Sequence, residues 1–253
     1  AILSSGCTAA APAPQDAAGR DAGEPPALEQ ASYIHGMKVL AHYFDGDLRI
    51  AKMQMMTVGS KRYMLQADCR ITAEAPLCPG NVMDVTDPLN VRIVNDHAWA
   101  DSYQGAELAY RQDIGKWIGV ISNERGVGKP GLQGVEILDF TDPTKVVPLS
   151  KWSVDGGDPE REIQTGGGTH RNWYDGGRYA YLAASPDDRY KSPPGSGPET
   201  VEGLQILDLQ DPTKPQLVSF WAPPGLRIDE VEARKTWAAA GNPKAFIGLH
   251  GPP

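Results

Sequence analysis

Short apolar runs that end at turn signals recur along most of this chain. The clearest run covers residues 135–138, contains β-branched side chains, and lies between Gly134 and the pair Asp142-Pro143. Such a run is typical of a strand that is covered on both faces. The aspartate can accept hydrogen bonds from backbone amides ahead of it, and the proline pre-sets φ for the second position of a type I turn. Residues 135–152 are therefore predicted to form a β-hairpin, with the second strand over residues 146–152.

The same unit occurs more than once. Residues 204–221 repeat residues 135–152, with Ile-Leu-Asp, Asp-Pro-Thr-Lys and a final Trp at equal offsets, and residues 82–94 form a weaker copy. The three Asp-Pro pairs lie 55 and 69 residues apart. Such spacings indicate propeller blades, whose period is ~40–50 residues, lengthened by loop insertions.

Two residue types recur at fixed places in the unit. The aspartate that ends the first strand recurs as Asp84, Asp139 and Asp208, and the tryptophan that ends the unit recurs as Trp152 and Trp221. Recurrence at one blade position favours a structural turn or an inter-blade hydrogen bond for the aspartates, rather than catalysis. For the tryptophans it favours packing within or between blades.

This unit resembles the LVIVD repeat. The resemblance is carried by GVEILDFTDPTK at residues 134–145 and GLQILDLQDPTKP at residues 203–215, each preceded by a strand of the type seen at residues 178–184. It spans roughly residues 35–253. Members of that family are built as β-propellers and serve different roles, so the resemblance implies a fold and leaves the chemistry open.

We therefore expect an all-β fold, a β-propeller built from four-stranded blades. The predicted blades cover about 37–95, 96–153 and 165–222, followed by an insertion over 223–243 and the start of a further blade over 244–253. Three blades are too few to close a propeller, which typically has about four to eight. The expectation is an incomplete propeller, whose remainder is supplied by missing C-terminal sequence.

Apolar alternation and turn signals set the elements within these blades. The inserted segment contains helix start and stop signals, which predict a short helix over residues 228–240. Residues 185–200 are rich in Pro, Gly and Ser and are predicted to be a long loop, either a surface insertion or a lid. The other predicted strands are 37–42, 48–58, 61–67, 81–85, 91–94, 106–111, 116–122, 178–184 and 244–249.

The first thirty residues differ from the rest. Residues 1–11 are small and apolar and residues 12–26 are rich in Ala, Pro, Gly, Asp and Glu, which indicates a signal-peptide remnant followed by a disordered linker. Ser4-Ser5-Gly6-Cys7 resembles a lipoprotein cleavage box, with Cys7 as the acylated residue and a possible membrane tether. Ala-Pro-Ala at residues 11–13 could instead precede ordinary cleavage. Both interpretations predict an exported protein, in the periplasm or at the cell surface.

Two further cysteines agree with export. Cys69 and Cys78 flank a short segment between two predicted strands, where a hairpin would bring them close enough to form a disulfide in an oxidising compartment. The alternative, a pair of metal ligands, has weaker support because the sequence has no CxxC motif and no second pair.

Composition excludes some partners. The net charge is −8 and the isoelectric point is about 5.1, which argues against nucleic acid as a partner, because a basic stripe is expected there. The sequence also has no run of 18 apolar residues.

Candidate chemistry gathers at the starts of the predicted inner strands. His170 and His250 would occupy equivalent inner positions in blades three and four, so their imidazoles could converge at one end of a central channel. There they could bind a transition metal such as Zn, Cu or Fe, or act as general bases. The residues predicted to orient an anionic or polar ligand nearby are Glu107, Arg171, Asn172 and Tyr174. The structural alternative is that these side chains form hydrogen bonds to backbone carbonyls between blades.

Three other patterns in the sequence have a structural interpretation that is stronger than the functional one. Met53, Met55 and Met56 could suggest copper thioethers, but methionines in a strand are more often core filling. Residues 126–131 superficially resemble a phosphate loop, yet Pro130 follows the lysine and no helical pattern follows. The remaining histidines have no partner at ligand spacing and are interpreted as surface or structural residues: His35, His42 and His97.

Three functions remain open from sequence. The favoured one is a binding or interaction platform in the cell envelope for a protein or small-molecule ligand. The first alternative is an enzyme with a channel-mouth site formed by His170, Arg171 and His250, an oxidoreductase or hydrolase that could depend on a metal. The second alternative is a purely structural surface protein. His170→Ala should abolish turnover in an enzyme and leave ligand binding intact in a platform.

Overall fold

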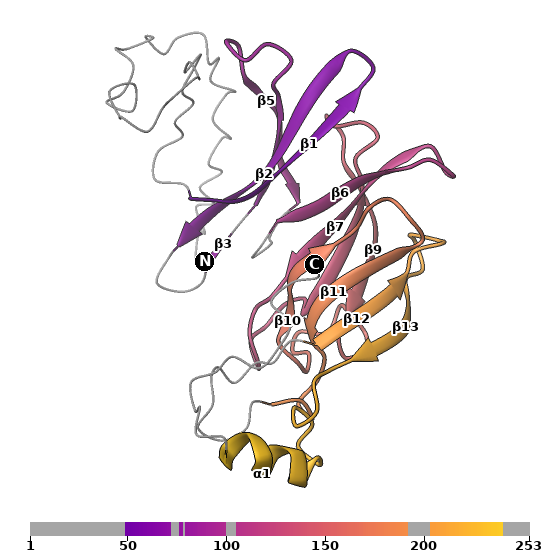
Figure 1. The fold of residues 1–253 in the computed structure, drawn as a ribbon. Helices are drawn as coiled ribbons and strands as arrows, with labels where there is room; N and C mark the ends of the chain where they lie inside the picture. The colour runs from indigo at the N-terminus through magenta and orange to yellow at the C-terminus, as the bar shows by residue number, and fades with distance from the viewer. Residues whose placement is uncertain (1–48, 72–75, 78, 100–104, 192–202, 240–253) are drawn as a thin grey trace, which may run out of the picture.

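The computed structural model describes residues 49–71, 76–77, 79–99, 105–191 and 203–239, and it is almost entirely β-structure. Three antiparallel sheets follow one another along the chain and down Figure 1. We call them blades 1, 2 and 3. Blade 1 consists of β1 (Arg49–Val58), β2 (Lys61–Ile71), β4 (Gly80–Asp84) and β5 (Arg92–Trp99), with the short β3 (Pro76–Leu77) paired to β2 off this path.

The other two blades have four strands each. Blade 2 consists of β6 (Ala106–Arg111), β7 (Lys116–Asn123), β8 (Gly134–Asp139) and β9 (Val147–Ser153). Blade 3 consists of β10 (Gly168–Trp173), β11 (Tyr179–Ser185), β12 (Gly203–Asp208) and β13 (Gln216–Trp221). In blades 2 and 3 neighbouring strands of the sheet are consecutive along the chain, and in blade 1 only the short β3 interrupts this order. The expected all-β fold with four-stranded, propeller-like blades is therefore confirmed.

The blades pack face to face through their first strands. β6 lies against β1 and β2, and β10 lies against β7 and β8. Alternation within β8 shows how one sheet serves two interfaces: Leu138 belongs to the core between blades 1 and 2, while Val135 and Ile137 belong to the core between blades 2 and 3. All three side chains are at most 1% exposed. Apolar residues on both faces of one strand thus build two cores, as the continuous apolar run predicted.

The repeated turn has the same hydrogen bonds in every blade. The backbone amide two residues ahead donates to Asp87, Asp142 and Asp211 at 2.9, 3.0 and 3.0 Å. These bonds confirm the turn that the Asp-Pro pairs predicted.

The aspartate that precedes each turn is also structural. The described ion pairs of these residues all lie within one blade, and they are Lys61–Asp84 at 3.6 Å, Lys116–Asp139 at 2.6 Å and Arg178–Asp208 at 2.5 Å. Each carboxylate also accepts a backbone amide two residues ahead, at 2.8 to 3.0 Å. The recurring aspartates therefore close a turn within their own blade, and the inter-blade alternative does not apply to these contacts.

The described start of the predicted long loop after β11 contacts the inserted segment. Tyr190 and Arg227 form an isolated antiparallel bridge, and the Lys191 amide donates to the Leu226 carbonyl at 2.9 Å. The helix α1 (Val231–Ala239) follows, within the range predicted for it, and lies at the far end of the molecule from blade 1 (Figure 1).

Two packing predictions need correction. Trp152 is partly buried against the core between blades 2 and 3, but Trp221 is 55% exposed, so the packing predicted for both tryptophans holds for Trp152. Met56 fills the core between blades 1 and 2, whereas Met53 and Met55 are 56% and 54% exposed. Core filling is therefore correct for Met56 and wrong for its two neighbours, because the chain alternates between covered and open faces of β1.

Several predictions concern residues outside the described ranges. These are the signal-peptide remnant and linker, lipidation at Cys7, the strands at 37–42 and 244–249, and His250. Cys78 also lies outside, and only the backbone of Cys69 is described, where it pairs with Arg49. The disulfide between these cysteines stays a prediction.

Candidate functional site

Charged side chains from two blades meet where β1 and β6 begin. Lys52 on β1 forms an ion pair with Glu107 on β6. Gly105, just before β6, allows the approach: a Cβ built there would lie 3.1 Å from the Cβ of Lys52, and its φ is +90°. Glu107 is 8% exposed, so this ion pair is largely removed from solvent. Glu107, which was predicted to orient a ligand, is held by Lys52 of the neighbouring blade.

Blade 3 contributes a further charged residue, Arg171, near Lys52. Burial lowers the pKa of the Lys52 ammonium, and the positive charge of Arg171 on β10 lowers it further. Arg171 is exposed, so its guanidinium is available at the surface. Lys52 is therefore paired with Glu107 and lies within electrostatic reach of Arg171. We call Lys52, Glu107 and Arg171 the inner-strand cluster.

His170 precedes Arg171 on β10. Its Nδ1 is 2.5 Å from Oε2 of Glu124, the residue that follows β7 in blade 2. The two side chains are 18% and 19% exposed, so the pair is partly buried yet reachable from solvent. A carboxylate at this distance orients the imidazole. His170 thus faces the adjacent blade's second strand and not its outer strands.

Asn172 and Tyr174 have a different environment from the one predicted. Asn172 is 5% exposed, and its Nδ2 donates to Ser122 Oγ at 2.9 Å and Thr169 Oγ1 at 3.2 Å. Tyr174 follows the other end of β10, is also 5% exposed, and belongs to the core between blades 2 and 3. Burial raises the pKa of its hydroxyl, which lies beside Arg111. The structure therefore pairs Glu107 with Lys52 and His170 with Glu124, places Arg171 within electrostatic reach of Lys52, and buries Asn172 and Tyr174 between the blades.

A buried amide network supports the loops around His170. The Gln133 amide donates to Oε1 of Gln164 at 2.9 Å, and its Nε2 donates to the carbonyl of Gly126 at 2.7 Å. Gln133 and Gln164 are 0% and 1% exposed. The glycine-rich segment at 126–131 is therefore fixed by a buried glutamine, in keeping with the rejection of a phosphate loop. Thr169 Oγ1 adds an inter-blade bond to the carbonyl of Gly134 at 2.7 Å.

Asp155 organises the loop that leads from blade 2 to blade 3. Its carboxylate accepts hydrogen bonds from Ser153 Oγ at 2.7 Å, from the amide of Gly157 at 2.9 Å, and from the amide and hydroxyl of Thr165 at 3.0 and 2.8 Å. Arg161 Nη2 adds a charged donor at 2.6 Å. Burial alone would raise the pKa of Asp155, but these bonds outweigh it and hold the pKa far below its usual range.

Asp155→Asn should therefore destabilise the protein in a pH-dependent way. The folded pKa is lower than the value of about 3.9 in an unfolded chain, so the carboxylate stabilises the fold above that pH and loses this effect as the pH falls toward the folded pKa. We expect a loss of about 1–2 kcal/mol at pH 7 that shrinks below about pH 3.5. Urea unfolding at both pH values measures it. Asp158→Asn, in the same loop but exposed, is the control and should change little at either pH.

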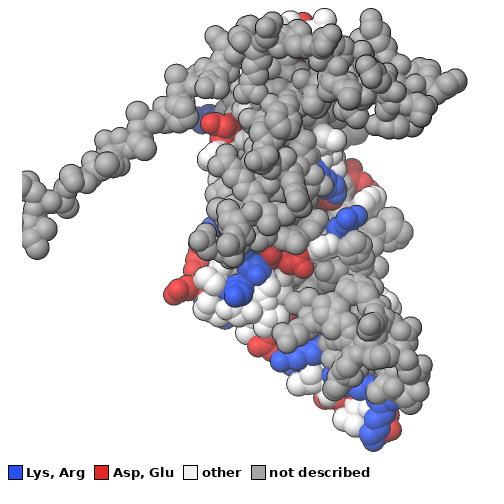
Figure 2. All heavy atoms as spheres, turned by 90° about the vertical axis from the view of Figure 1, so that its left-hand side faces the viewer, with Lys and Arg blue, Asp and Glu red and all other residues white. Residues whose placement is uncertain are grey.

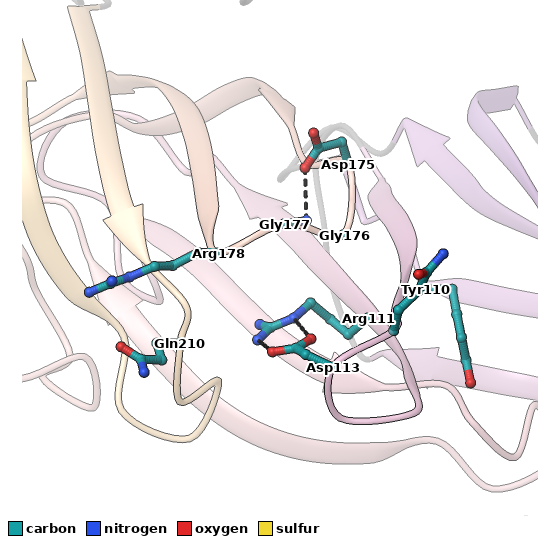
Figure 3. Close-up of a pocket in the computed structure, with 9 residues that line it drawn as sticks. Tyr110, Arg111, Asp113, Asp175, Gly176, Gly177, Arg178 and Gln210 are labelled. Carbon is teal, nitrogen blue, oxygen red and sulfur yellow. Dashed lines mark hydrogen bonds and ion pairs between the residues drawn. The ribbon is translucent and has the colours of Figure 1, made fainter.

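A pocket of about 500 Å³ lies at the opposite ends of β6 and β10 (Figure 3). Arg111, which is 1% exposed, donates from Nε and Nη2 to both carboxylate oxygens of Asp113, at 2.8 and 2.6 Å. Its Nη1 donates to the carbonyl of Leu209 in blade 3 at 2.6 Å. Arg178, on the opposite side of the pocket, is paired with Asp208. Because each cation here already has a carboxylate, this pocket offers less to an anion than the inner-strand cluster.

Sequence reasoning missed Lys52, Glu124 and Arg111. A signal existed for Lys52. It lies four residues before Met56 and therefore on the same face of β1, the face that meets blade 2. Arg111 is the last residue of an apolar strand and occupies the position in blade 2 that Val58 occupies in blade 1. This equivalence could have predicted that Arg111 is buried. Glu124 carries no such signal, because its partner lies in another blade.

Among the described residues, no three His, Cys, Asp or Glu side chains are grouped so that they could hold a metal ion. The only described helix is too short and too polar to cross a membrane.

Comparison with known proteins adds nothing to this picture: no protein-family model matches the chain, and no curated protein matches it. The fold defines an all-β protein with propeller-like blades. Its function has to be inferred from the inner-strand cluster and the His170–Glu124 pair.

Proposed function

We propose that this protein is an exported β-propeller protein of the LVIVD-repeat kind that acts as a binding platform in the cell envelope. Its ligand, a small molecule or a protein segment, presents an anionic group to Lys52 and Arg171. The proposal includes a location in the periplasm or at the cell surface, with Cys7 as a lipid anchor. The observation that carries it is the Lys52–Glu107 ion pair between blades 1 and 2, with Arg171 of blade 3 within electrostatic reach of Lys52.

Electrostatics supports an anionic ligand at this end. Burial lowers the pKa of Lys52, repulsion from the positive charge of Arg171 lowers it further, and Glu107 compensates one of the two charges. A carboxylate or phosphate placed between the two cations would relieve that repulsion, and the guanidinium can bind such a group through two parallel hydrogen bonds. On the described part of the face in Figure 2, acidic and basic side chains are interspersed. This mixture favours a small anionic group over a long polyanion.

Arg171→Ala should weaken the binding of a small tricarboxylate. Citrate serves as the probe, and isothermal titration calorimetry at low ionic strength measures its dissociation constant. We expect at least a tenfold increase for Arg171→Ala, because loss of a charged hydrogen-bond donor removes about 1.5–3 kcal/mol. The control is Arg189→Ala, which removes the same charge from an exposed arginine paired with Asp187. Equal weakening in both variants would show a non-specific charge effect and contradict the proposal.

The His170–Glu124 pair favours a second candidate, an enzyme. A histidine oriented by a carboxylate is the arrangement of a general base, and the predicted partner His250 would make it a metal-binding site. Elemental analysis of the full-length exported protein, beside His170→Ala, separates the metal-dependent form of this candidate from the platform. A stoichiometric metal that disappears in the variant would favour the enzyme. Metal absent from both proteins would count against that form of it.

A further inference from the structure

Blade 3 carries an open apolar face whose equivalent in blade 2 is buried. Val135 and Ile137 on β8 are 0% exposed, because blade 3 covers them. The repeat aligns them with Leu204 and Ile206 on β12, which point away from blade 2 and remain partly exposed. The same register position is thus covered in blade 2 and open in blade 3.

Aromatic residues extend this open face. Trp152 pairs with Val135 across the sheet and Trp221 pairs with Leu204 in the same way, yet Trp221 is 55% exposed. Trp173 stacks on Tyr181 with 5.5 Å between ring centroids and is 40% exposed. We call Trp173, Tyr181, Leu204, Ile206 and Trp221 the rear face.

Blade 1 has an open face of the complementary kind. The β6–β7 pairing places Ala106 opposite Ile121 and Leu108 opposite Gly119, and both are buried against blade 1, at 4% and 8% exposed. The β1–β2 pairing places Met53 and Met55 at the same two register positions of blade 1. They are 56% and 54% exposed. We call Met53 and Met55 the front face.

These two faces match each other as the internal interfaces do. In both internal interfaces the first strand of one blade lies on two adjacent strands of the blade before it, β6 on β1 and β2 and β10 on β7 and β8. A front face therefore fits a rear face in the way blade 2 fits blade 1. Contiguous apolar patches that combine Met and Trp mark interaction surfaces, and burying them contributes about 25 cal/mol per Å².

We propose that a second copy of this chain covers both faces, with the front face of each copy on the rear face of the other. Such a head-to-tail contact is heterologous, and the two contacts of a dimer would bury the front and rear faces of both copies. This inference is independent of the anionic ligand proposed above, because it rests on the blade faces alone.

Sedimentation velocity on the full chain tests the proposal. The expected result is a particle of twice the 27.2 kDa chain mass at about 20 µM protein. Met55→Asp and Trp221→Asp each place a charge on one face, and each should raise the dimer dissociation constant at least tenfold, since charge at an apolar interface core is strongly unfavourable. Both residues are exposed in the single chain, so folding should survive, and circular dichroism verifies this. Leu89→Asp, a 67% exposed apolar residue on a blade 1 turn, is the control.

Mixing the two variants makes the test specific for a head-to-tail contact. Met55→Asp keeps an intact rear face and Trp221→Asp keeps an intact front face, so an equimolar mixture should recover dimer through one intact interface. A monomer for the unmodified chain would overturn the proposal and assign the faces to another sheet or another protein. A dimer that neither variant weakens would overturn it as well.

Discussion

Gly168→Ala should cost the protein at least about 3 kcal/mol of unfolding free energy. Gly168 begins β10 with a φ of +89°, which L side chains rarely adopt. A Cβ there would lie 2.2 Å from the carbonyl oxygen of Asn123 and 2.8 Å from the Cα of Glu124. The neighbouring backbone belongs to another blade and cannot move without opening the interface that positions His170.

Urea unfolding measures this loss, and Gly126→Ala is the matched control. Gly126 has nearly the same φ, +88°, but a Cβ there meets nothing within 4 Å. The control should therefore lose only the conformational term, about 1 kcal/mol. Similar losses in the two variants would mean that blades 2 and 3 do not pack closely at Gly168.

Arg111→Met should destabilise the protein by about 2–3 kcal/mol, although no charge on the outer surface is removed. The methionine keeps much of the side-chain volume and loses the bond from Nη1 to the Leu209 carbonyl. That carbonyl belongs to a residue that is 0% exposed, so it would be left without its charged donor inside the interface between blades 2 and 3. The cost is therefore mainly that of an unsatisfied buried acceptor.

Arg178→Met separates this effect from the loss of an ion pair. Arg178 binds both oxygens of Asp208, at 3.0 and 2.5 Å, but it is exposed and its partner lies in the same blade. Because exposed ion pairs contribute little, this variant should lose much less stability than Arg111→Met. A ranking in the opposite order, measured by thermal unfolding of both variants, would refute an inter-blade role for Arg111.

The sequence predicts the elements of this protein well, because local rules determine them. Alternation and the Asp142-Pro143 and Asp211-Pro212 turns define the hairpins to within one or two residues. The turn at Asp175 is equally local, since its carboxylate accepts the amide of Gly177 at 2.8 Å. Signals of this kind depend on neighbours in the chain and need no knowledge of other blades.

The site was predicted less completely, because its geometry depends on contacts between blades. Glu107 and His170 were identified, but their partners Lys52 and Glu124 come from other sheets. Trp221 was expected to pack like Trp152, and it does not, because only Trp152 has a following blade against it among the described residues. A repeat in the sequence fixes equivalent positions, whereas burial also depends on what lies next to each position.

An NMR titration with citrate tests the central claim most directly, since it locates the ligand on the unmodified protein. The signals to follow are the Nε–Hε groups of the arginines and the side chain of Lys52. Binding at the inner-strand cluster predicts saturable shifts for Arg171 and Lys52 and none for Arg178, at the opposite end of the blades. Shifts at Arg178 without shifts at Arg171, or no saturable shift at all, would contradict the account.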